Sequence, residues 1–415
     1  MSEPVPLWLD CDPGHDDVFA ILLAAYHPGI RLLGISTVFG NAPLDKTTRN
    51  ARSVLAAIGK HPEIRVYAGA AHALERPPIH ATAIHGESGL DGTDLLPPPP
   101  PSPSPPPPSP SPSPSPSSSF PSSFPSFKNV DGDETKLSSP AVEAMASALK
   151  RTPPRSAWIA ATGALTNVAQ LFARHPELRA HVRGVSVMGG SVGDGFTPAV
   201  MGVVDGVPRV GNYTPWAEFN VLIDPEAAAA VFGDEVLRPK ITLVPLDLTH
   251  LVLANAEVQD LLLYGPPEDG GVREGRGKTD LRVMLVELLN FFAGTYRDVF
   301  GIVEGPPLHD PLAVAAVLAG TEHEIPFYDY DPKSAEGPSR RERFAVEVVT
   351  EGTLEEARER GAQTGRTLVT LLPPGREGVR IPRGLDIPLF WKVIEECCAR
   401  ADTVNKKILD TKPLN

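Results

Sequence analysis

The 415-residue chain has few of the features that mark secreted, membrane-bound or nucleic-acid-binding proteins. Its three cysteines, Cys11, Cys397 and Cys398, are an odd number with two adjacent, which does not fit a disulfide framework and favours a reduced compartment. No apolar run approaches the roughly 20 residues that span a bilayer. The first residues contain neither a basic region nor a long apolar stretch, so we expect no signal peptide and a cytoplasmic protein.

Acidic residues outnumber basic residues. The chain has 51 Asp and Glu but 38 Lys and Arg, which gives a formal net charge of −13. No cluster of Lys or Arg interrupts this acidic balance. Phosphate backbones and anionic lipids attract basic surfaces. We therefore expect neither a nucleic acid nor a membrane as a partner.

Proline, in contrast, is abundant: 47 residues, about 11% and roughly twice the usual share. Sixteen of them fall in residues 97–127, which otherwise contain 12 Ser and 3 Phe. We expect one domain over residues 1–415, interrupted at 97–127 by a low-complexity, disordered insert. A tolerated loop extension explains this insert most simply, and a P-x-x-P docking segment for an SH3- or WW-type partner is the alternative.

Short apolar runs alternate with segments of helical periodicity along most of the chain. Strands are expected at Pro6–Asp10, Arg31–Thr37, Ile64–Tyr67, Ala157–Ala161, Val182–Met188 and Lys240–Val244. Helices are expected at Asp16–Tyr26, Pro43–Ile58, Val142–Leu149, Leu165–Arg174, Asp224–Val231, Leu281–Phe300 and Asp310–Leu318. The alternation predicts an α/β fold, a doubly wound and mostly parallel sheet with helices on both faces. Strands at 344–350 and 366–372 and a helix near Pro388–Arg400 are appended to it.

An acidic cluster directly follows the first predicted strand. Asp10, Asp12, Asp16 and Asp17 lie within eight residues, around the turn-forming pair Pro13-Gly14. Ligands of open α/β sheets bind beyond the carboxyl ends of the strands, and carboxylates without cysteine suit Ca²⁺ or Mg²⁺. Acidic residues that merely favour the helix dipole are the structural alternative. A D-x-D after a first strand also resembles, weakly, the metal-dependent phosphatases of the haloacid dehalogenase type.

Further motifs stand at later strand ends and in the same order as in one known family. They are DCDPGHDD (10–17), VFGN (38–41), IHGESGLDG (84–92), TGALTN (162–167), NYTPWAEFN (212–220) and PPLHDP (306–311). Together they closely resemble the nucleoside hydrolases of the inosine–uridine-preferring type, over about three quarters of the chain. The resemblance implies hydrolysis of the N-glycosidic bond of ribonucleosides to free base and ribose, by a homodimer or homotetramer.

The same resemblance implies a bound Ca²⁺. Its ligands would be the carboxylates of Asp12, Asp17 and Asp310 and the backbone carbonyl of Thr162. The calcium ion would activate a water molecule, Asp12 would take its proton as general base, and the transition state would be oxocarbenium-like. Asp10 is expected to support this cluster from behind.

The sugar and the base are assigned to a second set of residues by resemblance. The ribose-binding residues would be Asp16, Asn41, Asn212, Glu218 and Asn220. Glu218 and Asn220 are two apart, so in an extended segment both side chains would face one side. His309 would contact or protonate the leaving base, and His85 and Tyr296 are further candidates.

Several features depart from the family pattern. The segments 191–211, 266–278 and 331–341 look like additions, and the first adjoins the ribose residues, where it would reshape the base pocket. The preferred base therefore stays open. His15 is expected to be incidental, because this position of the motif tolerates apolar residues. A catalytically silent scaffold with a Pro-rich docking segment is a further alternative to the enzyme.

Deletion of residues 97–127 tests whether the insert takes part in the reaction. We expect kcat/KM for uridine to stay within about twofold, because long surface insertions have small energetic effects. A large loss in the deletion variant would show that the insert is coupled to the adjoining IHGESGLDG segment.

Overall fold

The fold is described from a computed structural model, which describes residues 3–100, 139–204, 206–267, 275–333 and 341–411. The predicted insert 97–127 lies outside the described residues apart from its first four positions. The predicted loops 266–278 and 331–341 are described in part.

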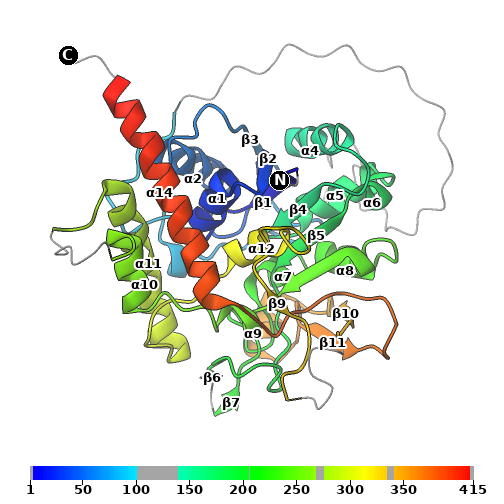
Figure 1. The fold of residues 1–415 in the computed structure, drawn as a ribbon. Helices are drawn as coiled ribbons and strands as arrows, with labels where there is room; N and C mark the ends of the chain where they lie inside the picture. Colours follow the sequence, from blue (N-terminus) through cyan, green and yellow to red (C-terminus); the bar gives the residue numbers. More distant parts are fainter. Residues whose placement is uncertain (1–2, 101–138, 205, 268–274, 334–340, 412–415) are drawn as a thin grey trace.

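A six-stranded sheet forms the centre of the molecule, with the strand order β3-β2-β1-β4-β5-β8 (Figure 1). Its strands are β1 (Val5–Cys11), β2 (Ile30–Thr37), β3 (Val66–Ala68), β4 (Trp158–Ala161), β5 (Gly184–Met188) and β8 (Ile241–Val244). All neighbouring pairs are parallel. The order runs outward from β1 in both directions, which confirms the predicted doubly wound α/β fold.

Helices cover both faces of this sheet and bury two apolar cores. The helices of the described residues, including those away from the sheet, are α1 (Asp17–Tyr26), α2 (Leu44–Ala57), α3 (Thr82–His85), α4 (Pro140–Lys150), α5 (Thr166–Arg174), α6 (Leu178–His181), α7 (Phe219–Ile223), α8 (Pro225–Gly233), α9 (Leu246–Thr249), α10 (Ala256–Tyr264), α11 (Asp280–Thr295), α12 (Asp310–Ala316), α13 (Leu354–Glu359) and α14 (Ile387–Thr411). On one face α1 packs against α12 and α14, and on the other α5 packs against α4 and α8. No described helix has the length and apolarity needed to cross a membrane.

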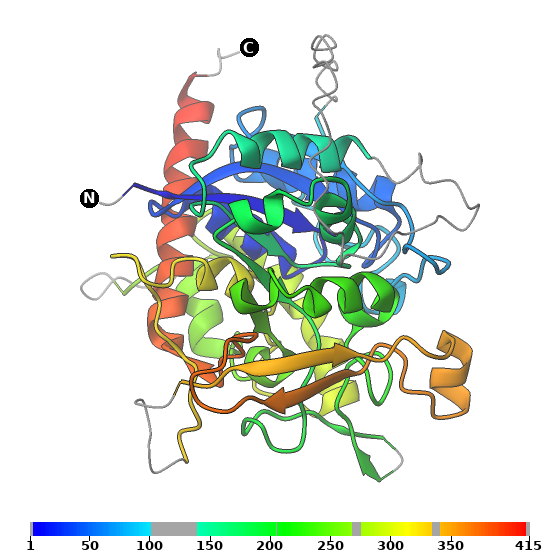
Figure 2. The same cartoon turned by 90° about the vertical axis from the view of Figure 1, so that its right-hand side faces the viewer.

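The C-terminal part adds the predicted strands β10 (Phe344–Val348) and β11 (Thr367–Leu371), which pair antiparallel and pack against α8 (Figure 2). Two-stranded pairs are also formed by β6 (Val203–Val204) with β7 (Val207–Pro208), and by β9 (Phe327–Tyr328) with β12 (Gly384–Leu385). A 3₁₀ turn, η2 (Arg238–Lys240), precedes β8.

Two predicted helices differ from the structure, and several helices, α10 the longest of them, have no predicted counterpart. The final helix α14 continues to Thr411 instead of ending near Arg400, because no Gly or Pro interrupts it before Pro413. The long helix predicted to Phe300 changes at Tyr296 into a π-helical turn, η3 (Tyr296–Phe300). Helix α10 has no predicted counterpart, since Leu262 is its one buried residue and its apolar periodicity is weak.

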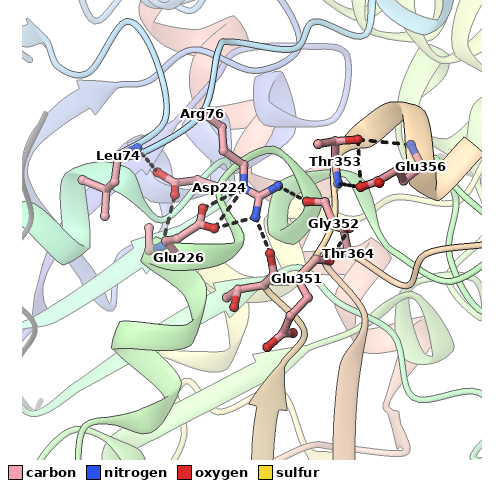
Figure 3. Close-up of polar contacts among 11 residues, drawn as sticks. Leu74, Arg76, Asp224, Glu226, Glu351, Gly352, Thr353, Glu356 and Thr364 are labelled. Carbon is pink, nitrogen blue, oxygen red and sulfur yellow. Dashed lines mark hydrogen bonds and ion pairs between the residues drawn. The ribbon is translucent and has the colours of Figure 1, made fainter. Parts of the chain in front are cut away.

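Arg76 joins three distant parts of the chain beside this sheet (Figure 3). Its Nε donates to both carboxylate oxygens of Glu226 in α8, at 2.9 Å each. Its Nη1 donates to the carbonyl of Gly352 at 2.6 Å, and its Nη2 to that of Thr350. The segment after β3 is thereby fixed to α8 and to the turn that follows β10.

Asp224, at the N-terminus of α8, fixes the same segment from below (Figure 3). Its Oδ2 accepts from the backbone N–H of Leu74 at 3.0 Å and from the Thr166 hydroxyl at 2.5 Å, and its Oδ1 caps α8 at Ala227. This anchoring matters because the chain runs directly from residue 76 to α3, which borders the site described below.

Replacement of Arg76 by Met is expected to lower the free energy of unfolding by about 2–3 kcal/mol, because the partly buried Glu226 carboxylate and two carbonyls lose their donors. Urea denaturation measures this loss. The matched control is Arg174→Met, whose ion pair with Glu143 is solvent-exposed and is expected to contribute about 0.5 kcal/mol or less. Equal effects of the two substitutions would contradict the anchoring role.

Candidate active site

A cavity opens at the carboxyl ends of the parallel strands, where ligands of such sheets bind. Its lining residues are Asp16, Asn41, Ala81, Ile84, His85, Thr162, Met188, Asn212, Glu218, Phe219, Asn220, Phe292, Tyr296, His309 and Asp310. Ten of the predicted site residues are among them. Asp10, Asp12 and Asp17 lie immediately behind this lining and are buried.

A larger hollow of about 1080 Å³ lies between α2, residues 87–98 and α11. Neither His309 nor any carboxylate of the acidic cluster lines it. Several of its charged side chains, among them Glu87 and Arg276, are exposed to solvent. We place the active site in the smaller cavity, because there buried carboxylates and histidines converge on one space.

Asp10 lies near the end of β1 and is buried within the sheet. Its Oδ1 accepts from the side chain of Asn167 at 2.8 Å and from the hydroxyl of Ser36. Asn167 in turn accepts from the N–H of Ala70, so it joins β1 to the segment after β3. Sequence reasoning missed Asn167 and Ser36, although Asn167 stands in the TGALTN motif.

Asp12 is held between two glycines at the end of β1. Its Oδ2 accepts from the backbone N–H of Asn41 at 2.8 Å. Its Oδ1 is buried without a hydrogen-bond partner among the described residues. A Cβ atom on Gly163 would lie 2.5 Å from this Oδ1, and one on Gly40 would overlap Oδ2. The two glycines therefore leave room for the Asp12 carboxylate, and its Oδ1 could bind a cation.

Three further carboxylates face one another beside Asp12. Asp16, Asp17 and Asp310 each place an oxygen within 4.8 Å of the others. Asp17 also accepts from the N–H of Gly14 and from the hydroxyl of Thr162, both at 2.9 Å. The Gly14 contact is the tight turn expected from Pro13-Gly14.

Burial and mutual repulsion shift the protonation of this cluster. Burial, together with the charge of Asp17, raises the pKa of Asp16 to about 8 and that of Asp12 well above its usual range. Burial and the charges of Asp16, Asp17 and Asp12 likewise raise the pKa of Asp310. Among the described residues, no Lys or Arg lines the cavity to offset these charges. An all-oxygen donor set of this charge fits a hard divalent cation.

Glu218 and Asn220 reach the cavity in a way that differs from the prediction. Instead of alternating along an extended segment, Glu218 caps α7 and Asn220 lies in its first turn. The Glu218 carboxylate accepts from the N–H groups of Asn220, Val221 and Gly190 at 2.8, 3.1 and 2.8 Å. The cap forms because a carboxylate satisfies the free N–H groups of a helix start.

The amide groups of the predicted ribose site are oriented by backbone atoms. Asn220 donates to the carbonyl of Thr162 at 2.9 Å, and Asn212 accepts from the N–H of Phe219 at 2.9 Å. Asn41 donates to the carbonyl of Asp12 at 3.1 Å. These side chains are therefore fixed before a substrate binds.

Aromatic and imidazole rings form the opposite end of the cavity. The ring nitrogens of His309 lie 2.7 Å from the hydroxyls of Tyr296 and Thr249. Burial lowers the pKa of His309 well below its usual range and raises that of Tyr296 well above it. His309 is thus a neutral imidazole and Tyr296 a protonated phenol near pH 7. Tyr296, a minor candidate in the sequence, belongs to the same unit as His309.

The 191–211 segment acts from behind this end, and none of its described residues lines the cavity. Arg209 stacks on the ring of Phe300 at 4.9 Å and donates to the carbonyl of Asn212 at 3.1 Å. The carbonyl of Val200 accepts from Nδ1 of His250 at 2.7 Å. The ring of His250 packs at 5.7 Å from those of both Tyr296 and His309. The described part of the segment therefore contacts residues that lie behind the cavity wall.

Comparison with known proteins agrees with this geometry. Residues 7–392 match the family described as inosine-uridine preferring nucleoside hydrolase. The uridine nucleosidase of Saccharomyces cerevisiae is 36% identical over 405 residues, covering 97% of this chain and 98% of the yeast protein. A pyrimidine-specific ribonucleoside hydrolase RihA from Salmonella arizonae is 34% identical, covering 76% and 79% of the two chains.

Solved structures show the same fold. The purine-preferring ribonucleoside hydrolase from Gardnerella vaginalis superposes with a TM-score of 0.66 and 22% identity, over 96% of this chain and 99% of that one. Neither the phosphatase nor the silent-scaffold alternative is favoured by these comparisons. The chain therefore belongs to the inosine-uridine preferring nucleoside hydrolase family and is a ribonucleoside-hydrolysing enzyme.

Proposed function

We propose that the protein hydrolyses the N-glycosidic bond of ribonucleosides, with Ca²⁺ held at the acidic end of the cavity. The observation that carries this proposal is the pairing of two opposite environments in one cavity. Buried carboxylates stand at one end, with no Lys or Arg of the described residues in the lining, and a neutral His309–Tyr296 pair stands at the other. The first suits a cation and a developing positive charge, and the second suits a leaving base.

The acidic end fits a calcium ion through its own donors. The carboxylates of Asp12, Asp17 and Asp310 and the carbonyl of Thr162 would hold it. The unpartnered Oδ1 of Asp12 supports this fit, since a buried carboxylate oxygen without a donor is costly. When bound, the ion supplies the positive charge that acidifies a water molecule.

Asp12 is the proposed general base. Its Oδ1 is free of hydrogen bonds, and burial raises its pKa, so that it holds a proton more readily than an exposed aspartate. The remaining groups bind the sugar: Asp16, Asn41, Asn212, Glu218 and Asn220. Their carboxylates and amides match the hydroxyls of a ribose and orient the ring for attack. Carboxylates beside the ring also stabilise the oxocarbenium-like charge.

The His309–Tyr296 pair would receive the leaving base. The Tyr296 hydroxyl is 2.7 Å from Nε2 of His309, so whichever group gives a proton to the leaving base has its negative charge stabilised by a hydrogen bond from the other until solvent returns the proton. Burial keeps the phenol protonated, which makes it a donor at neutral pH.

Three expectations on the assembly stay predictions. They are one domain over residues 1–415, a homodimer or homotetramer in the cytoplasm, and an insert at 97–127 without a part in the reaction.

A substrate panel tests the proposed function. Purified protein is assayed for ribose release from uridine, cytidine, inosine and adenosine, before and after treatment with a chelator. We expect ribose release that the chelator abolishes and added Ca²⁺ restores, because the carboxylates need the cation. Full activity after metal removal would refute the calcium proposal, and phosphate release from nucleotides without ribose release would favour the phosphatase.

Substitution of the acidic cluster tests the residue roles. Asp12→Ala and Asp17→Asn are each expected to lower kcat for the best substrate by roughly 100-fold or more while the fold is kept. Circular dichroism checks the fold. The control is Asp45→Asn, an exposed aspartate in the first turn of α2, whose activity is expected to stay near that of the wild type. Near-normal turnover of Asp12→Ala would exclude it as the base.

Tyr296→Phe and His309→Ala test protonation of the leaving base. Both are expected to lower kcat by about 10- to 100-fold on nucleosides, and by different factors for different bases. A riboside with 4-nitrophenolate as leaving group needs no protonation, so its turnover is expected to be nearly unchanged. An equal loss on all substrates would remove the pair from this role.

A further inference from the structure

Two buried histidines lie between the acidic loop and the cavity. His15, in the loop from Asp12 to Asp17, has 0% exposure, and His85 at the end of α3 lines the cavity. Their Nδ1 atoms are 2.9 Å apart. The motif led us to expect an incidental role for His15. In the structure its ring instead joins the acidic loop to His85, 70 residues further along the chain.

The contacts of His15 determine where the protons of both rings lie. Its Nε2 is 2.7 Å from the carbonyl oxygen of Asp91, which only accepts, so this nitrogen carries the proton. In a neutral ring Nδ1 then has a lone pair. Because it faces Nδ1 of His85, that nitrogen must donate, and Nε2 of His85 is left as an acceptor. His85 Nε2 has no hydrogen-bond partner among the described residues.

Packing holds both rings in this arrangement. The His15 ring stacks on those of His85 and Phe291, each at a centroid distance of 5.1 Å. A Cβ atom on Gly14 would lie 2.6 Å from Nδ1 of His85. The glycine of the acidic loop thus leaves room for the His85 ring.

Neutrality of the two rings follows from the same surroundings. Both rings are buried, and burial favours the neutral form of an imidazole. Across the His15 ring lie Phe291, Phe292 and His85, and no carboxylate is hydrogen-bonded to it in the described part of the chain.

We propose that His15 is a positioning residue for substrate binding: it fixes the tautomer of His85, a residue that lines the cavity, so that Nε2 of His85 accepts a hydrogen bond from a hydroxyl or N–H group of the nucleoside. In this tautomer His85 cannot donate a proton to the leaving base, which separates its role from that of Tyr296 and His309. The inference rests on the proposed ribonucleoside hydrolysis and assigns His15 a part in it.

A matched pair of variants isolates the contact. In His15→Asn the carboxamide oxygen replaces Nδ1 as acceptor for His85, whereas in His15→Gln the carboxamide replaces Nε2 as donor to Asp91. Both lose the stacked ring equally. We expect His15→Gln to raise KM for uridine about five- to tenfold with kcat within twofold, the loss of about one hydrogen bond in binding. His15→Asn is expected to restore KM to within about twofold of the wild type.

Inhibition by the two reaction products shows whether the ribose or the base carries the group that donates to Nε2 of His85. Ribose and uracil are each tested as competitive inhibitors, and we expect His15→Gln to weaken the inhibition by one of them. In a His85→Gln background, His15→Gln is expected to have no further effect on KM. Equal KM values for His15→Asn and His15→Gln, with both folded, would overturn the proposal, because a merely structural ring would give that result.

A spectroscopic readout does not depend on activity. Nitrogen-15 NMR of ring-labelled wild-type protein is expected to show His85 protonated at Nδ1, and His15→Gln to shift it toward the Nε2-protonated form. An Nε2-protonated His85 in the wild type would refute the inference whatever the enzyme hydrolyses. Absence of ribose release from the wild type, with the Nδ1 tautomer present, would refute the proposed function alone.

Discussion

The repulsion among buried carboxylates is the constraint on which the rest of the site depends. Asp12, Asp16, Asp17 and Asp310 converge at the carboxyl edge of the sheet, where burial and neighbouring charge hold their pKa values above the usual range. Such an arrangement is unfavourable by itself and is relieved by a cation. The fold therefore maintains a binding site at the expense of local stability, as functional sites commonly do.

Rigid surroundings keep these like charges together. Backbone N–H groups from three places, at Asn41, Gly14 and Gly190, donate to the carboxylates of Asp12, Asp17 and Glu218. The segment between β3 and α3 is fixed to α8 by Arg76 and Asp224, and to β1 through Asn167. His85, at the end of the helix α3 that follows this segment, is thereby held beside His15. The acidic end and the opposite wall are thus parts of one hydrogen-bonded body.

Much of this was predictable because the signals are local. Residues 6–9 of the first strand are continuously apolar, as in a buried parallel strand, and the acidic motif begins directly after them at Asp10. The error at Glu218 and Asn220 has an equally local cause, since two polar residues separated by one fit either a strand or a capped helix start. Helix and strand propensities do not distinguish these two possibilities. The capped helix start forms because backbone N–H groups of α7 and of Gly190 donate to the Glu218 carboxylate.

The sequence by itself determined the doubly wound sheet, the order of the motifs and the acidic character of the site, because periodicity and residue chemistry are read over a few neighbouring positions. The tertiary structure alone decided the partners of the side chains. The contacts of His15 with His85, of Tyr296 with His309 and of Arg209 with Asn212 depend on how helices and loops pack. Packing brings together residues far apart in the chain, and a ring's tautomer follows from the atoms it meets there.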